Sequence, residues 1–127
     1  MEKKFKIALI EDDEVLSSAL KGELEESGFE VVHAFDGVAG FELVKIEKPD
    51  LILLDIIMPK LDGISLLKRL KENNEVKAIP VVMLTVFGSQ EKIANTIEIG
   101  AEAYFIKDQQ SMGNVVSAVK TMLEKKV

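Results

Sequence analysis

The stretch that decides the fold is Leu51-Ile52-Leu53-Leu54-Asp55-Ile56-Ile57-Met58-Pro59, with Asp62-Gly63 shortly after it. Four apolar residues directly precede a carboxylate. A turn marked by proline and glycine follows the carboxylate. A short run this apolar predicts a strand that is buried on both faces. Asp55 would then lie just past the carboxyl end of that strand, where a carboxylate either caps a turn or takes part in chemistry.

Similar apolar runs lie on both sides of this stretch. The expected strands are Phe5–Ile10, Phe29–His33, Leu51–Leu54, Val81–Leu84 and Ala103–Ile106. Apolar residues at helical spacing follow each strand in turn; they are Val15, Leu16, Ala19, Leu20 and Leu24, then Phe41, Val44 and Ile46, then Ile64, Leu67 and Leu70, then Ile93, Ala94 and Ile97, then Val115, Ala118, Val119, Met122 and Leu123.

Turn and capping residues separate these segments. Gly28 and Gly100 are typical helix stops, the Asp36-Gly37 pair indicates a turn, and Asp62 and Ser89 are good N-caps. Five strands alternating with five helices predict an α/β fold, with a doubly wound parallel sheet covered by helices on both faces as three α/β/α layers.

Length and composition agree with one globular domain spanning residues 1–127. Hydrophobic residues make up 47% of the 127 residues and charged residues 30%, and the net charge is −6. An acidic chain without a basic patch does not favour direct binding to nucleic acid or to a membrane surface. The absence of cysteine excludes disulfides and thiolate metal sites. The short apolar stretch after Met1 is not a signal peptide or a membrane span, so we expect a cytoplasmic location.

Polar residues follow four of the five expected strands. They are Glu11, Asp12 and Asp13 after the first strand, Asp55 after the third, Thr85 after the fourth and Lys107 after the fifth. Ligands bind at the carboxyl ends of strands in such sheets, and the flavodoxin-like strand order 2-1-3-4-5 would place Asp12 beside Asp55.

Clustered carboxylates repel one another unless a cation neutralises them. An all-oxygen ligand set suits a hard cation such as Mg²⁺, which takes one or two carboxylates together with phosphate oxygens. Lys107 is a point charge suited to a phosphate, the Thr85 hydroxyl can donate to a phosphoryl oxygen, and a carboxylate can itself be the nucleophile in aspartyl-phosphate chemistry.

In these residues the chain resembles the receiver domain of two-component response regulators, over essentially its whole length. The matching positions are Glu11-Asp12, Asp55 within Asp-Ile-Ile-Met-Pro-Lys-Leu-Asp-Gly, Thr85, and Lys107 three residues after Tyr104. Each motif alone is weak, but together and in this order they are highly specific.

The resemblance implies a switch that helps to catalyse its own phosphorylation but acts by binding partners. Asp55 would accept a phosphoryl group from a histidine kinase or a histidine phosphotransfer protein. Asp12, Asp55 and the backbone carbonyl of Ile57 would coordinate Mg²⁺ directly, and Glu11 through water. Lys107 would pair with the phosphoryl group and Thr85 would hydrogen-bond to it.

The resemblance further implies that the Thr85 hydroxyl shift couples to rotation of Tyr104. That rotation would remodel the face of the fourth helix, fifth strand and fifth helix, which binds a downstream protein or an effector domain. We expect a monomer, or a dimer through that face after phosphorylation. Plain packing is an equal alternative for Tyr104.

Some positions depart from the commonest family pattern. Asp108 follows Lys107 where proline is usual, and Val86 follows Thr85 where a small alanine is usual. Ile57 and Phe87 place apolar bulk beside the site, where the family tunes hydrolysis of the acyl phosphate, so we expect a slowly decaying phosphoryl state.

The same residues allow other interpretations. Asp12 could be a helix N-cap, Asp13 is expected to be a first-turn partner of the helix dipole, and Asp62 is expected to be a simple N-cap. His33, the sole histidine, receives no catalytic role. A degenerate receiver that only binds a partner is the main alternative, although the intact site residues argue against it. An aspartate-nucleophile phosphatase is less favoured, because its general acid would stand at position 57, which is isoleucine.

Overall fold

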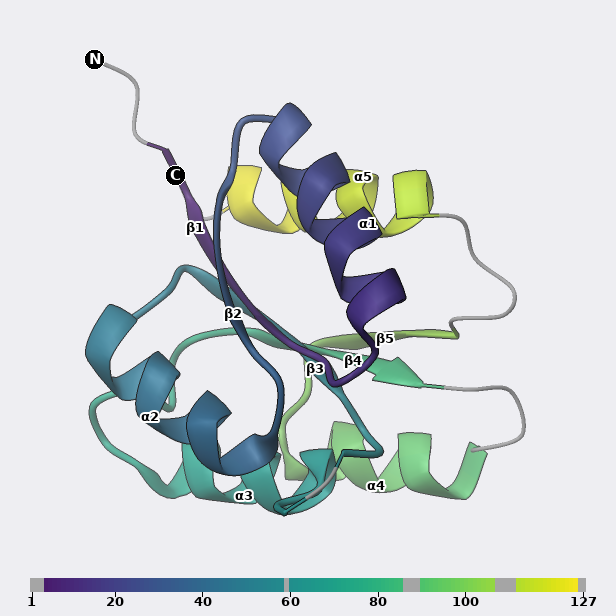
Figure 1. Cartoon of the computed structure of the whole chain (residues 1–127). Coiled ribbons are helices and arrows are strands. Elements are labelled where there is room, and N and C mark those ends of the chain that lie inside the picture. The colour runs from purple at the N-terminus through teal and green to yellow at the C-terminus, as the bar shows by residue number, and fades with distance from the viewer. Residues whose placement is uncertain (1–3, 59, 86–89, 107–111, 126–127) are drawn as a thin grey trace.

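Five parallel strands form a single sheet, with helices on both faces (Figure 1). The computed structural model describes residues 4–58, 60–85, 90–106 and 112–125. In chain order the elements are β1 (Lys6–Ile10), α1 (Glu14–Glu26), β2 (Glu30–Ala34), α2 (Gly37–Glu47), β3 (Leu51–Asp55), α3 (Gly63–Glu72), β4 (Val81–Thr85), α4 (Gln90–Ile99), β5 (Ala103–Ile106) and α5 (Met112–Glu124). The strand order is β2-β1-β3-β4-β5, which confirms the predicted α/β fold.

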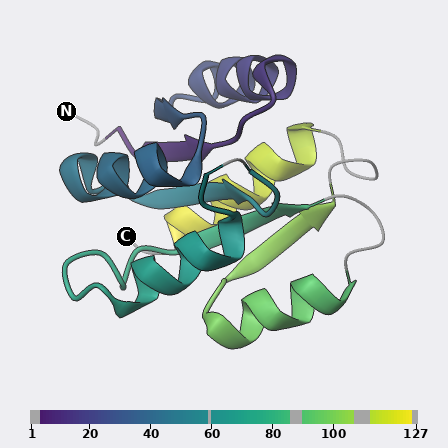
Figure 2. The same cartoon turned by 60° about the horizontal axis from the view of Figure 1, so that its bottom comes forward.

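Each face of the sheet has its own layer of helices. α1 and α5 cover one face, and α2, α3 and α4 cover the other (Figure 1). Figure 2 brings the second layer forward, so that α2, α3 and α4 lie in front of the sheet and α5 lies behind it. None of the helices in the described ranges is long and apolar enough to cross a membrane.

The central strand β3 supplies apolar side chains to both cores. Leu51 and Leu53 pack with residues of α1 and α5, whereas Ile52 and Leu54 pack with residues of α2 and α3. All four side chains are completely buried. Successive side chains of a strand point to opposite faces, so a central strand between two helix layers must be apolar at every position.

Some sequence expectations were wrong in detail. β2 runs one residue later than expected, while Asp55 and Thr85 are the last residues of their strands rather than the first beyond them. Asp36 does more than mark a turn, since its carboxylate accepts a hydrogen bond from Ala39 N at 2.8 Å and caps α2. Gly28, with φ of 96°, ends α1 as predicted.

The buried faces of three helices also differ from the expected ones. Among the residues expected to face the core, the exposed ones are Val15 and Ala19 on α1, Ile46 on α2, and Ala94 and Ile97 on α4. On α1 the buried stripe is Ser17, Leu20 and Leu24. Since each residue advances about 100° around a helix, this stripe turns Val15 away from the sheet.

Candidate functional site

Three carboxylates meet at the carboxyl edge of the sheet. Glu11 follows the last residue of β1, Asp12 comes next, and Asp55 ends the neighbouring strand β3. One carboxylate oxygen from each residue lies within 4.8 Å of the others. Glu11 and Asp55 are buried, whereas Asp12 is exposed. The structure therefore brings Asp12 and Asp55 together as the strand order predicted.

The strand register explains why these side chains meet. Ile10 is paired with Leu54 across β1 and β3, so each of the two strands delivers its next residue to the same level of the sheet. On the other side of β3, Asp55 is paired with Leu84, and Ile56 N donates to Leu84 O at 3.1 Å. Pairing with β4 at Asp55 itself, and with β1 up to the preceding Leu54, holds the backbone of Asp55 in the central strand.

A cavity of about 270 Å³ opens at this edge. Its lining residues are Glu11, Asp12, Asp13, Asp55, Ile56, Ile57 and Thr85. Thr85 is almost completely buried, and it comes from β4 on the far side of Asp55. The Ile57 side chain is 56% exposed, so an apolar group stands in water at the cavity. The cavity thus combines acidic groups, one hydroxyl and one exposed aliphatic side chain.

Asp13 has a structural role that separates it from its two acidic neighbours. Its carboxylate accepts hydrogen bonds from Val15 N at 3.0 Å and Leu16 N at 3.1 Å, so Asp13 is the N-cap of α1 and not, as expected, a residue of its first turn. Its own backbone N–H donates to Glu11 Oε1 at 3.1 Å. The start of α1 therefore holds the Glu11 carboxylate in place.

Gly63 supports Asp55 from behind, a contact that the sequence analysis missed. A Cβ atom at position 63 would lie 2.7 Å from Ile56 Cα and closer still to the Asp55 carbonyl oxygen. Gly63 N also donates to Ile56 O at 2.7 Å. The start of α3 is thus pressed against the end of β3, which only a residue without a side chain allows.

Asp62, the residue before this glycine, is the predicted N-cap of α3. Its carboxylate accepts hydrogen bonds from Ser65 N at 2.9 Å and Ser65 Oγ at 3.0 Å. The backbone N–H of Ser65 is the main reason why the pKa of Asp62 lies below its usual value of 3.8. The Asp-Gly pair of the sequence therefore consists of a helix cap and a close backbone contact.

The loop after β3 is also tied to the start of α2. Lys60 Nζ lies 3.6 Å from Asp36 Oδ2. The pKa of Asp36 is lowered, first by the backbone N–H of Ala39 and then by the Lys60 ammonium. A Cβ atom on Gly37 would lie 2.7 Å from Leu61 Cβ, so this glycine permits the close approach of the two segments.

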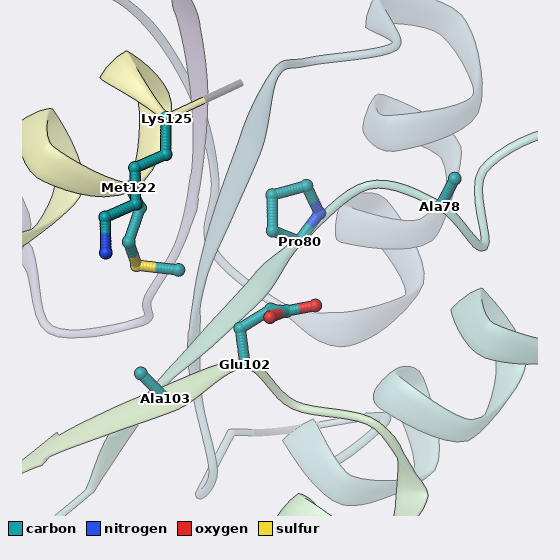
Figure 3. Close-up of a pocket in the computed structure, with 6 residues that line it drawn as sticks. All are labelled: Ala78, Pro80, Glu102, Ala103, Met122 and Lys125. Atoms are coloured by element: carbon teal, nitrogen blue, oxygen red, sulfur yellow. The ribbon is translucent and has the colours of Figure 1, made fainter.

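A second cavity, of about 430 Å³, lies at the opposite edge of the sheet (Figure 3). Its lining residues are Ala78, Pro80, Glu102, Ala103, Met122 and Lys125. Pro80 and Glu102 directly precede β4 and β5, so this cavity faces the amino ends of the strands. In Figure 3 the Met122 side chain reaches from α5 toward the space between Pro80 and Ala103. The cavity is therefore separate from the carboxylate cluster.

Part of the predicted site falls on residues whose placement is not described. They are Lys107, Val86, Phe87, Asp108 and the expected N-cap Ser89. Of the remaining predicted residues, Tyr104 lies on β5 paired with Met83 and is 41% exposed. Thr85 is paired with Ile106, the residue before Lys107. The structure therefore brings together the predicted residues of β1, β3 and β4, and the roles of all of them remain predictions.

The donor set fits a hard divalent cation. Three carboxylates with oxygens within 4.8 Å of one another carry a high local negative charge, which a cation would offset. Because all of these donors are oxygens, they match the preference of Mg²⁺ rather than that of softer metals.

Comparison with known proteins agrees with this geometry. The sequence profile of the response regulator receiver domain matches residues 7–120. Over 102 residues, 80% of this chain, the sequence is 42% identical to the transcriptional regulatory protein CpxR of Escherichia coli and 37% identical to the alkaline phosphatase synthesis transcriptional regulatory protein PhoP of Bacillus subtilis. Each match covers 42% of the relative, so this chain spans less than half of their length.

Solved structures show the same likeness. A receiver domain of the Francisella response regulator 1452 superimposes with a TM-score of 0.89 at 29% identity, covering 98% of this chain and all of that one. The signal receiver domain of a histidine kinase from Syntrophus aciditrophicus gives 0.86 at 30% identity, covering 95% and 91%.

The fold and its acidic edge define a phosphorylation-dependent signalling module. The chain belongs to the response regulator receiver domain family of two-component systems. Members of this family use Mg²⁺ at an acidic pocket and receive phosphoryl groups from histidine kinases or phosphotransfer proteins, and the relatives of this chain are named as regulators rather than as enzymes.

Proposed function

We propose that the chain is a single receiver domain over residues 1–127, which acts in the cytoplasm and is switched by phosphorylation of Asp55. The observation that carries this proposal is the meeting of Glu11, Asp12 and Asp55 within 4.8 Å, in a cavity that Thr85 also lines. A buried carboxylate at the end of a central strand is held rigidly, which in-line attack on phosphorus requires.

In the proposed reaction an Asp55 carboxylate oxygen attacks the phosphorus of a phosphohistidine. The new P–O bond forms as the P–N bond breaks, and the imidazole of the kinase or phosphotransfer protein leaves. Asp12, Asp55 and the Ile57 carbonyl would hold Mg²⁺ directly and Glu11 through water. The bound cation would neutralise charge on the phosphoryl oxygens.

The remaining polar groups act on the product. The Thr85 hydroxyl, on the strand next to Asp55, would donate to a phosphoryl oxygen, and Lys107 would pair with another. The exposed Ile57, together with Phe87, would hinder the approach of water and so slow hydrolysis of the acyl phosphate. Replacing both, as Ile57→Asn with Phe87→Ala, should shorten the phosphoryl half-life, and an unchanged half-life would contradict this role.

The proposed output is the face formed by α4, β5 and α5. Large apolar groups are already exposed on two of these elements, namely Ile97 on α4 and Tyr104 on β5. The aromatic ring of Tyr104 would move as Thr85 engages the phosphoryl group, which changes what this face can bind. The partner would be a downstream protein or an effector domain. The chain would be a monomer, or a dimer through this face once it is phosphorylated.

Intact mass spectrometry after incubation with a small acyl-phosphate donor tests the proposal. The native chain should gain one phosphoryl group in the presence of Mg²⁺ and none without it, and Asp55→Asn should gain none. Asp50→Asn is the matched control, because Asp50 directly precedes β3 and lies at the opposite edge of the sheet from Asp55. If Asp55→Asn is labelled as the native chain is, the assignment of the acceptor fails. If the native chain takes up no label, the chain is a receiver that only binds partners.

A further inference from the structure

The side chain of His33, on β2, reaches the acidic loop that follows β1. Its Nε2 atom lies 3.0 Å from the backbone carbonyl oxygen of Glu11, which is 22 positions earlier in the chain. A carbonyl oxygen can only accept, so Nε2 must carry the hydrogen. Both the neutral Nε2–H tautomer and the imidazolium satisfy this condition, and the bond therefore does not depend on the charge of the ring.

This hydrogen bond lies where it can affect the geometry of the carboxylate cluster. Strand pairing between β1 and β2 ends at Ile10 and Ala34, and Glu11 N still donates to Ala34 O at 3.1 Å. The Glu11 carbonyl then accepts a hydrogen bond from His33, which lies on the same strand β2. β2 thus holds the backbone of Glu11 through both of its polar groups.

The carbonyl of Glu11 shares one planar peptide unit with the N–H of Asp12. A hydrogen bond to that oxygen consequently fixes the orientation of the peptide plane before Asp12, and with it the direction of the Asp12 side chain. Glu11 also has its carboxylate held by Asp13 N. The side chain of His33 therefore orients the Glu11–Asp12 peptide, and this peptide directs the exposed Asp12 carboxylate toward Asp55.

Phe35 covers the imidazole and supports this geometry. The two ring centroids are 4.0 Å apart and the rings are tilted by 46°. Phe35 lies just past the end of β2, two residues after His33, and its ring contacts the imidazole. Partial cover by an aromatic ring limits competition from water for the Nε2–H bond.

We infer that His33 is a positioning residue for the cation site, which acts by fixing the Glu11–Asp12 peptide. This inference rests on the proposed function, because it assumes that Asp12 and Asp55 hold Mg²⁺. Hydrogen-bond partners behind metal ligands commonly alter metal affinity by about 10- to 100-fold. Since His33 acts on the backbone rather than on a ligand atom, we expect an effect at the lower end, about tenfold.

Calorimetric titration with Mg²⁺ alone tests the inference on three chains. His33→Phe keeps an aromatic ring beside Phe35 but removes the donor, and should raise the Kd for Mg²⁺ about tenfold. His33→Gln supplies an amide N–H in place of the imidazole and should restore affinity to within about threefold of native. Urea unfolding of each chain shows whether an affinity change reflects a lost donor or a damaged fold.

Four results would overturn the inference. Native affinity in His33→Phe would show that the bond does not matter, and equal weakening in His33→Gln would show that the ring packing matters instead. Imidazole nitrogen shifts of the native chain that reveal an unprotonated Nε2 would exclude the bond without using any variant. A native chain that binds no Mg²⁺ would overturn the proposed cation site and this inference together, whereas the first three results leave the proposed site standing.

Discussion

Gly63→Ala is the substitution that tests most sharply how Asp55 is held. The added Cβ would lie 2.7 Å from Ile56 Cα, while ordinary carbon contacts need about 3.5 Å. The two segments must therefore separate by at least about 0.8 Å, and by more at the Asp55 carbonyl oxygen, which lies closer still. Both contacting partners are backbone atoms that cannot rotate away. The separation would also stretch the 2.7 Å hydrogen bond from Gly63 N to Ile56 O.

The expected loss of stability follows from the steric overlap and from the stretched hydrogen bond. Overpacking of a tight contact costs about 1 to 3 kcal/mol, and a weakened backbone hydrogen bond adds about 1 kcal/mol, so the free energy of unfolding should fall by about 2 to 4 kcal/mol. Because the backbone at Asp55 moves as well, affinity for Mg²⁺ and phosphoryl uptake should fall in the same variant.

Gly22→Ala is the matched control, because it makes the same substitution in the middle of α1. A Cβ atom there would meet nothing within 4 Å. Alanine is favoured over glycine inside a helix by about 0.5 to 1 kcal/mol, so this variant should be more stable than the native chain in urea unfolding. If Gly63→Ala unfolds within about 0.5 kcal/mol of native, the argument that α3 is pressed against Asp55 is refuted.

Three further predictions concern the same edge of the sheet. The pKa of Asp62 in the folded chain lies below 3.8, so its capping contribution to stability should be complete above pH 3.8 and lost as the pH falls through the folded pKa. The native chain should be more stable than Asp62→Ala by about 1 kcal/mol near neutral pH, and this difference should shrink in acid. A difference that stays constant with pH would refute the cap. Leu54→Ala, at a completely buried position, should cost about 2 to 5 kcal/mol in urea unfolding, and a smaller loss would mean that the core relaxes into the space. Lys60→Gln should change stability by less than about 1 kcal/mol, since Lys60 is largely exposed, and a greater loss would show that its contact with Asp36 matters more than a surface ion pair usually does.

The strand-end residues could be predicted because parallel strands impose a simple rule. An apolar run such as Leu51–Leu54 shows where a strand lies, and all parallel strands present their carboxyl ends at one edge. The proximity of Asp12 and Asp55 then needs only the strand order. The prediction survived an error of one residue in several strand ends, because the error concerns only where a strand is taken to end and leaves Asp55 directly after Leu54.

Helix faces were harder to predict, because apolar residues alone do not show which stripe is buried. Val15 and Ala19 fit a helical period with Leu20 and Leu24, yet the buried stripe includes Ser17 instead. A short helix with few strongly apolar positions allows more than one stripe, and packing against the sheet decides between them.

Gly63 and His33 were missed for a different reason. Their contacts join segments that local patterns cannot relate, since His33 reaches a carbonyl 22 positions away and Gly63 touches the backbone of a preceding strand. The Asp-Gly pair could have raised the expectation of a close approach, because glycine is favoured where backbones meet. A lone histidine at a strand end gives no comparable pattern, and its partner is visible only in the folded chain.

These two contacts control the two sides of the site independently. Gly63 acts on Asp55 through β3, and His33 acts on Asp12 through the peptide after β1. Asp55 is buried within paired strands, whereas Asp12 is exposed on a loop, so the acceptor side is rigid and the opposing ligand depends on its loop contacts. A change at His33 should therefore alter cation affinity while leaving the Asp55 backbone in place, and the effects of His33→Phe and Gly63→Ala on stability should be close to additive. A strong coupling between them would mean that the loop after β1 and the start of α3 move as one unit.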